Sequence, residues 1–110
     1  SQPPVEFRFG DVLVDLLRGR LYKRGQQMQL PTKEFHLLRQ LIENRGVTLS
    51  RTALLNEVWG YRSSLTRTVD VHIAMLRQRL EDHPQRPRYI LTVRGKGYRF
   101  VGPPVDEADC

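Results

Sequence analysis

The sequence predicts one α+β domain with an N-terminal four-stranded antiparallel sheet, three helices and a C-terminal β-hairpin. Short alternating runs between turn residues fill the first thirty positions, three segments of helical periodicity follow, and two strand-like runs then flank a glycine-rich tip. A chain of 110 residues, 39% of them hydrophobic, suffices for one modest core. We expect residues 5–102 to form this domain, residues 1–4 to be a linker remnant and residues 103–110 to be an acidic tail.

The first thirty residues carry the pattern of short strands. Phe7 and Phe9 alternate with polar residues, and further apolar runs occupy residues 12–14, 21–22 and 28–30. Gly25 lies between the last two runs and can supply the positive φ that a tight turn needs. We therefore predict a small antiparallel sheet with a hairpin tip at residues 24–26.

Two shorter helical segments come next. From Thr32 the apolar residues fall on one helical face, and residues 44–46 (NRG) are a stop signal. The apolar residues of this face are Phe35, Leu38, Leu41 and Ile42. Ser50 is a candidate N-cap for a second helix that ends at Gly60, with Leu54, Leu55 and Val58 facing inward.

The third helical segment, residues 66–82, has the clearest pattern. Val69, Ile73, Leu76 and Leu80 are spaced by four, three and four residues, which is the buried stripe of an amphipathic helix. Prolines at positions 84 and 87 end it. Two strand-like runs, residues 89–93 and 98–101, follow and are joined by residues 94–97 (RGKG). Three helices and a final two-stranded wing predict a winged helix-turn-helix.

Positive charge is concentrated in the C-terminal half of the chain. Residues 61–100 hold nine basic and three acidic residues, a net +6, whereas the +3 of residues 1–60 is cancelled by the −3 of residues 101–110. A concentrated basic surface is expected of a protein that binds polyanions. Charge alone fits nucleic acid, an anionic membrane surface and a solvated basic face.

The outward face of the third helix suits the major groove of duplex DNA, because a helix has the width of that groove. Arg67 and Arg79 suit phosphate or guanine, and Gln78 suits adenine. Val71 and Met75, like Ala74, suit thymine methyl groups, although a protein partner would also accept exposed apolar residues.

Two further candidates for DNA contact have alternatives. His72 is expected to contact phosphate, and a partly buried histidine at the helix flank is the alternative. At the hairpin tip, Arg94 is expected to enter the minor groove and Lys96 to contact phosphate, with a solvated loop as the alternative. The Gly-x-Gly of this tip lacks the third glycine and the following helix of a nucleotide-binding loop.

Five strings in order along the chain resemble the C-terminal effector domain of OmpR/PhoB-type response regulators. They are residues 30–38 (LPTKEFHLL), 49–51 (LSR), 54–61 (LLNEVWGY), 67–77 (RTVDVHI and LR) and 92–100 (TVRGKGYRF). The resemblance implies a cytoplasmic bacterial transcription regulator that binds double-stranded DNA as a head-to-tail dimer. It also implies a receiver domain absent from this sequence and a sensor kinase.

The resemblance also assigns residue roles. It implies phosphate contacts by Arg67, Thr68, His72 and Arg77, a base contact by Val71, and minor-groove contacts by Thr92 and Arg94. It implies that RNA polymerase is met by the loop of Trp59, Tyr61, Arg62, Ser63, Ser64 and Leu65. Two departures stand out: Ala74 and Met75 occupy positions where relatives often carry arginines, and Pro31-Thr32 replaces a common Thr-Pro, so that Thr32 either caps the first helix or leaves it uncapped.

Other functions have weaker support. A one-component regulator, which can carry a membrane anchor, and a protein-interaction module are the alternatives to a response-regulator domain. We expect no enzymatic activity, cofactor or membrane contact, because no catalytic grouping or apolar span is apparent. We expect no metal site, because His36, His72 and His83 have no ligand spacing and Cys110 is the only cysteine.

Overall fold

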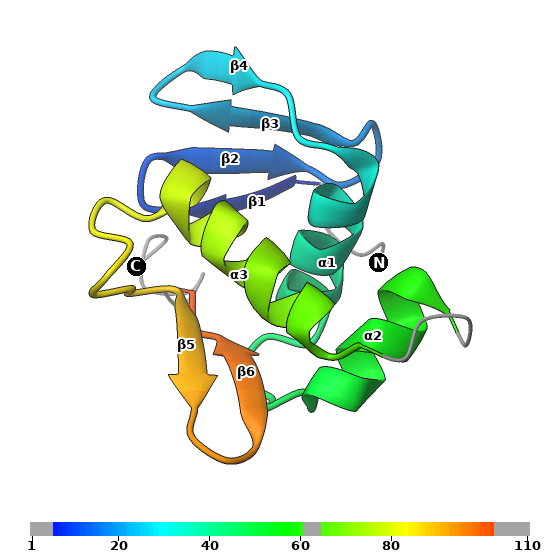
Figure 1. Ribbon diagram of the computed structural model, residues 1–110. Helices are drawn as coiled ribbons and strands as arrows, with labels where there is room; N and C mark the ends of the chain where they lie inside the picture. Colours follow the sequence, from blue (N-terminus) through cyan, green and yellow to red (C-terminus); the bar gives the residue numbers. More distant parts are fainter. Residues whose placement is uncertain (1–5, 61–64, 103–110) are drawn as a thin grey trace. The chain divides into compact units, whose positions relative to one another are not determined.

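The computed structural model describes residues 6–60 and 65–102, which fall into two compact units, residues 6–30 and residues 31–102 (Figure 1). The α+β fold, with a four-stranded sheet, three helices and a two-stranded hairpin, is as predicted. No helix among the described residues is long and apolar enough to span a membrane.

The first unit is an antiparallel meander of β1 (Glu6–Phe9), β2 (Val12–Asp15), β3 (Arg20–Lys23) and β4 (Gln26–Met28). Phe7, Val14, Leu21 and Met28 are register partners across the sheet, and the first three are buried. The turn between β3 and β4 is the predicted one.

That turn and the end of β4 add two details. Arg24 and Gly25 both have positive φ, 53° and 81°, as a two-residue type I′ turn requires. The prediction that the last strand reaches Leu30 was wrong, because β4 ends at Met28.

Helix α1 (Thr32–Glu43) begins without a side-chain cap, since Pro31 occupies the N-cap position. Its buried face differs from the predicted one at three positions: Phe35 is only half-buried, whereas Glu34 and Leu37 are buried. Asn44 ends the helix as predicted, and its side-chain amide donates to the carbonyl oxygen of Gln40 at 2.9 Å.

Helix α2 (Arg51–Trp59) has the predicted cap. The Ser50 hydroxyl accepts a hydrogen bond from the amide of Ala53 at 3.0 Å, and Gly60 ends the helix with φ 80°. A serine at this position satisfies one of the amides that the first turn leaves without a partner.

Helix α3 (Arg67–Leu80) is shorter than the predicted 66–82. Thr66 is the N-cap residue, and Glu81 leaves the helix with an extended backbone, so Asp82 lies beyond it. The buried carboxylate of Glu81 accepts the amides of Arg88, Tyr89 and Ile90 at 2.8, 2.9 and 2.8 Å. These charge-assisted bonds, which join the end of α3 to the start of the next strand, account for the early stop.

The hairpin of β5 (Ile90–Val93) and β6 (Gly97–Phe100), called the wing below, lies near α3 (Figure 1) and is hydrogen-bonded to it through Asp70 and Arg77. Leu49 and Tyr98 exchange backbone hydrogen bonds of 2.8 and 3.0 Å, which tie β6 to the segment before α2. The wing is therefore held to the helices by backbone pairing as well as by side chains.

Candidate nucleic-acid interface

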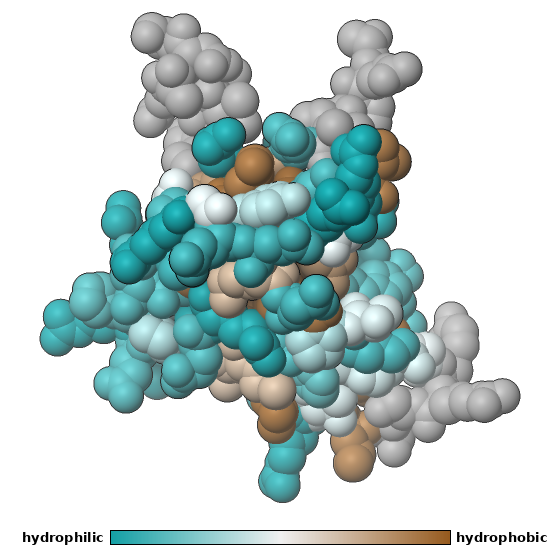
Figure 2. Space-filling view, turned by 90° about the horizontal axis from the view of Figure 1, so that it is seen from above, coloured by the Kyte–Doolittle hydropathy of each residue, from teal (hydrophilic) through white to brown (hydrophobic). Residues whose placement is uncertain are grey.

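The outward face of α3 is exposed as predicted. Arg67, Val71, Ala74, Met75 and Gln78 are exposed, whereas Val69, Ile73, Leu76 and Leu80 are buried. Figure 2 views the molecule from above, onto the side of β3 and β4, where hydrophilic residues predominate and hydrophobic ones lie in small separate patches. Among the described residues, Val71 and Met75, 49% and 39% exposed, are the exposed large hydrophobic residues of α3. One turn apart, they form a short apolar strip on an otherwise polar face.

His72 lies at the flank of this face, half-buried against α2. Its imidazole stands edge-on to the indole of Trp59, with ring centroids 4.8 Å apart, and its Nδ1 is 2.9 Å from the carbonyl oxygen of Thr68. A carbonyl only accepts, so Nδ1 carries a proton, and Nε2 can donate to a phosphate only when the ring is protonated. The packing foreseen as the alternative is present, and phosphate contact remains a prediction.

Arg77 connects α3 to the wing. Its Nε and Nη2 donate to the carbonyl oxygen of Ile90 at 3.0 and 2.8 Å, and Nη2 also donates to the hydroxyl of Thr92 at 2.8 Å. Its guanidinium carbon lies 5.7 Å from the ring centroid of Tyr98. Burial lowers the pKa of this guanidinium. Arg77 and Thr92, both predicted to contact DNA, thus contact each other.

A second link between α3 and the wing is built on Asp70. Its carboxylate accepts a hydrogen bond of 2.6 Å from the Tyr98 hydroxyl and two from the guanidinium of Arg51 on α2. Burial opposes ionisation of Asp70, but the bonds from Tyr98 and Arg51 outweigh it and lower the pKa of the carboxyl. Burial and the bond to Asp70 raise the pKa of Tyr98 to about 12. Asp70 therefore joins α2, α3 and β6.

Arg79 is bonded to α1. Its Nε donates at 2.8 Å to a carboxylate oxygen of Glu34, a side chain that is only 1% exposed. A charged group so deeply buried needs a partner of opposite charge. This ion pair gives Arg79 a role within the helical unit in addition to its predicted role on DNA.

The wing tip carries two exposed cations. Arg94 and Lys96 are both exposed, and the amide of Lys96 donates to the carbonyl of Val93 at 2.9 Å, which closes the turn around Gly95. The tip also borders a groove of about 610 Å³. The groove is lined by Ser50, Arg51, Thr52, Thr66, Asp70 and residues 92–98. The starts of α2 and α3 and the wing thus share one surface.

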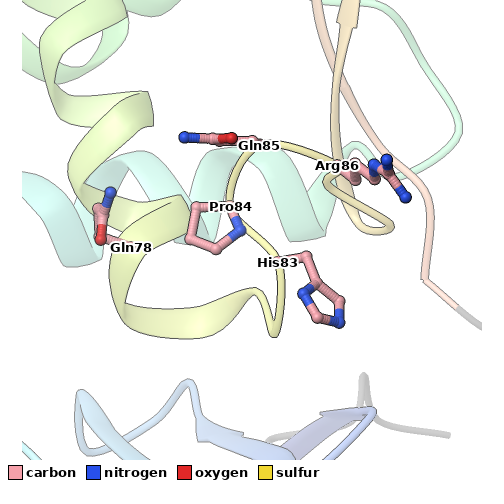
Figure 3. A pocket seen from close by; sticks show the side chains of 5 residues that line it. All are labelled: Gln78, His83, Pro84, Gln85 and Arg86. Atoms are coloured by element: carbon pink, nitrogen blue, oxygen red, sulfur yellow. The ribbon is translucent and has the colours of Figure 1, made fainter.

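A separate depression of about 390 Å³ follows the end of α3. In Figure 3, Gln78 lies to the left of Pro84 and Gln85 lies above it, while the side chain of Arg86 points away from them to the right. Within residues 6–60 and 65–102, no histidine, cysteine and carboxylate side chains gather in a group that could hold a metal ion.

The predicted polymerase-contact loop is only partly described. Tyr61, Arg62, Ser63 and Ser64 lie outside the described residues. Trp59 is the last residue of α2 and its ring packs on His72, whereas Leu65 is 67% exposed.

Sequence reasoning missed three structural anchors. It treated Arg51 only as part of a matching string, and it assigned no partner to Glu34 or Glu81. Hydrophobic periodicity cannot predict these partners. Arg51 is 19 residues from Asp70, Glu34 is 45 residues from Arg79, and Glu81 bonds to backbone amides. A carboxylate on the apolar side of a helical pattern, as at Glu34, is the one available signal.

Comparison with known proteins gives concordant results. Residues 25–100 match the family described as "Transcriptional regulatory protein, C terminal". A probable transcriptional regulator, ycf27 of Galdieria sulphuraria, is 50% identical over 94 residues, covering 83% of this chain and 37% of that protein.

Two solved structures have the same fold. The response regulator DrrB of Thermotoga maritima, an OmpR/PhoB homologue, has a TM-score of 0.83 and 39% identity, covering 89% of this chain and 45% of that one. The DNA-binding domain of RstA from Klebsiella pneumoniae, in complex with the RstA box, has a TM-score of 0.75 and 33% identity, covering 87% and 96%.

Proposed function

The chain belongs to the family of C-terminal domains of transcriptional regulatory proteins, as a DNA-binding domain of the OmpR/PhoB type, and we propose how it engages the duplex. Helix α3 lies in the major groove, and the wing places Arg94 in the adjacent minor groove. The observation that carries this proposal is that the exposed strip of α3 and the cationic wing tip belong to two elements hydrogen-bonded to each other.

Base recognition by α3 is largely apolar. Val71 and Met75 contact thymine methyl groups, while the exposed amide of Gln78 can pair with adenine. Arg67, exposed at the first turn of α3, contacts phosphate, as do Thr68, His72 and Lys96. Polar sequence discrimination then depends more on Arg94, whose guanidinium favours the narrow minor groove of A/T-rich DNA.

The larger assembly follows from the family. The chain spans less than half the length of curated relatives such as ycf27, so regulation involves parts outside it. We infer a receiver domain controlled by a sensor kinase, head-to-tail pairs of domains on tandem half-sites, and contact of RNA polymerase with the loop that includes Leu65. The cytoplasmic, bacterial setting is likewise a proposal.

A salt titration on a duplex selected from random sequences tests the groove contacts. Each phosphate contact is expected to add about −0.9 to the slope of log K against log salt concentration. A flat slope would refute the proposal. Duplexes with one and two half-sites test pairing, because the second site should raise affinity only at the preferred spacing.

Arg94→Ala tests the wing. We expect a loss of about 1 to 3 kcal/mol that is greatest where the adjacent minor groove is A/T-rich. Arg20→Ala, which removes an exposed arginine from β3, is the matched control and should leave this preference unchanged. An equal loss on all sequences would make Arg94 a phosphate contact instead.

A further inference from the structure

We infer that Arg77 is a positioning residue that fixes the wing relative to α3, so that the major-groove and minor-groove contacts are made by one rigid unit. The inference rests on the proposed groove contacts. It also assigns Arg77 a role different from the phosphate contact that the resemblance implies.

The first observation that supports the inference is the set of hydrogen bonds donated by the Arg77 guanidinium. Two of its three nitrogens donate to acceptors on β5, the Ile90 carbonyl and the Thr92 hydroxyl, at 2.8 to 3.0 Å. The planar fork of arginine reaches two acceptors in a fixed geometry, which the single ammonium of lysine does not reproduce. The side chain is half-buried, so a phosphate would have to compete with bonds already formed in the free protein.

The second observation is that β6, the other strand of the wing, is also bonded to α3. Tyr98 on β6 donates to Asp70 on α3, and the Arg77 guanidinium stacks over the Tyr98 ring at 5.7 Å. Asp70 and Arg77 are seven residues apart, two turns of helix, so α3 holds β6 and β5 at two successive points. These two attachments, on different strands, add to the Leu49–Tyr98 backbone pairing in restraining rotation of the wing.

The consequence concerns recognition. The spacing between bases read by α3 and the minor groove read by Arg94 is set before binding, and less conformational entropy is lost on the duplex. Loss of the Arg77 bonds to Ile90 and Thr92 should therefore weaken the contribution of Arg94 at the tip of the same hairpin.

The test begins without DNA. Amide heteronuclear NOE values at Gly95 and Lys96 are measured in the free domain for the wild type, Arg77→Lys, Arg77→Gln and Arg67→Gln. We expect both Arg77 variants to lower these values and Arg67→Gln, which removes the same charge from an exposed position of α3, to leave them unchanged. Thr92→Val, which removes one acceptor and no charge, should lower the NOE values by a smaller amount. This variant tests the inference if an Arg77 variant fails to fold.

The second arm uses the selected duplex. Arg77→Lys should lose about tenfold in affinity, as expected for bonds to a charged donor, while the salt slope stays that of the wild type. Arg67→Gln should reduce the slope by about 0.9. In a double-mutant cycle, Arg94→Ala should cost less in the Arg77→Lys background than in the wild type.

The measurements distinguish failure of this inference from failure of the proposed function. Unchanged wing NOE values, an Arg77→Lys affinity equal to that of the wild type and a slope reduced by about 0.9 in Arg77→Gln would make Arg77 a phosphate ligand and overturn the inference. A wild-type domain without specific duplex binding, or an Arg94→Ala variant without any loss, would instead overturn the proposed function and its use of the wing.

Discussion

A Cβ atom on Gly97 would lie 2.0 Å from the backbone carbonyl oxygen of Leu49. The approach is this close because the neighbouring residue, Tyr98, exchanges two backbone hydrogen bonds with Leu49. The first residue of β6 thus fits under the segment before α2 only as glycine, and the wing is fixed at its root.

Gly97→Ala should lower the free energy of unfolding by about 3 kcal/mol, because the methyl group meets backbone and φ is 149°. Chemical denaturation measures the loss. Gly95→Ala is the control: its φ is also positive, at 76°, but no atom lies within 4 Å, so we expect only about 1 kcal/mol. Equal losses in both variants would show that the contact with Leu49 has no cost.

Glu81→Ala should destabilise the domain by about 2 to 4 kcal/mol, because three amides at residues 88–90, one of them buried, lose a charged acceptor. Thermal unfolding by calorimetry measures the change. The exposed Glu57, changed to glutamine, should alter stability by less than about 0.5 kcal/mol. A Glu81→Ala domain as stable as the wild type would contradict this account of where α3 ends.

Asp70→Asn should show a pH-dependent loss of stability. The pKa of Asp70 is lowered in the folded state, so its carboxylate adds stability above the unfolded-state pKa, and this contribution disappears as the pH falls through the folded-state pKa. The stability difference between wild type and variant should shrink below about pH 4, when measured by urea denaturation at several pH values. A difference that stayed constant into stronger acid would contradict ionisation-linked bonding.

Trp59 should report binding through His72. It is the only tryptophan of the chain, and its indole contacts the imidazole that we place at a phosphate. Titration with duplex should change the fluorescence emission of Trp59. The midpoint of this change should equal the midpoint of a binding titration followed by the anisotropy of labelled DNA. Emission that did not change at saturation would argue against a phosphate near His72.

The buried faces and turns could largely be predicted from the sequence. The stripe of α3 from Val69 to Leu80 follows from helical spacing, and the Ser50 cap and the Gly25 turn follow from backbone preferences of those residues. These features depend on neighbours within a few residues. They were predicted correctly because local spacing is enough to specify them.

The polar links of the interface could not be predicted in this way. Whether Arg77 faces a phosphate or Ile90 depends on where β5 packs, 13 residues further along the chain. Asp70 likewise finds Arg51 and Tyr98 only through the tertiary arrangement. The early end of α3 has the same origin, since Glu81 bonds to backbone amides at residues 88–90.

Titration of the ¹⁵N-labelled domain with its selected duplex, followed by amide chemical shifts, tests the central claim most directly. We predict the largest shifts at Arg67, Val71 and Met75 of α3 and at Arg94 and Lys96 of the wing tip, with small shifts in β1–β4. Shifts concentrated in β1–β4, or in α3 without the wing tip, would contradict binding by helix and wing together.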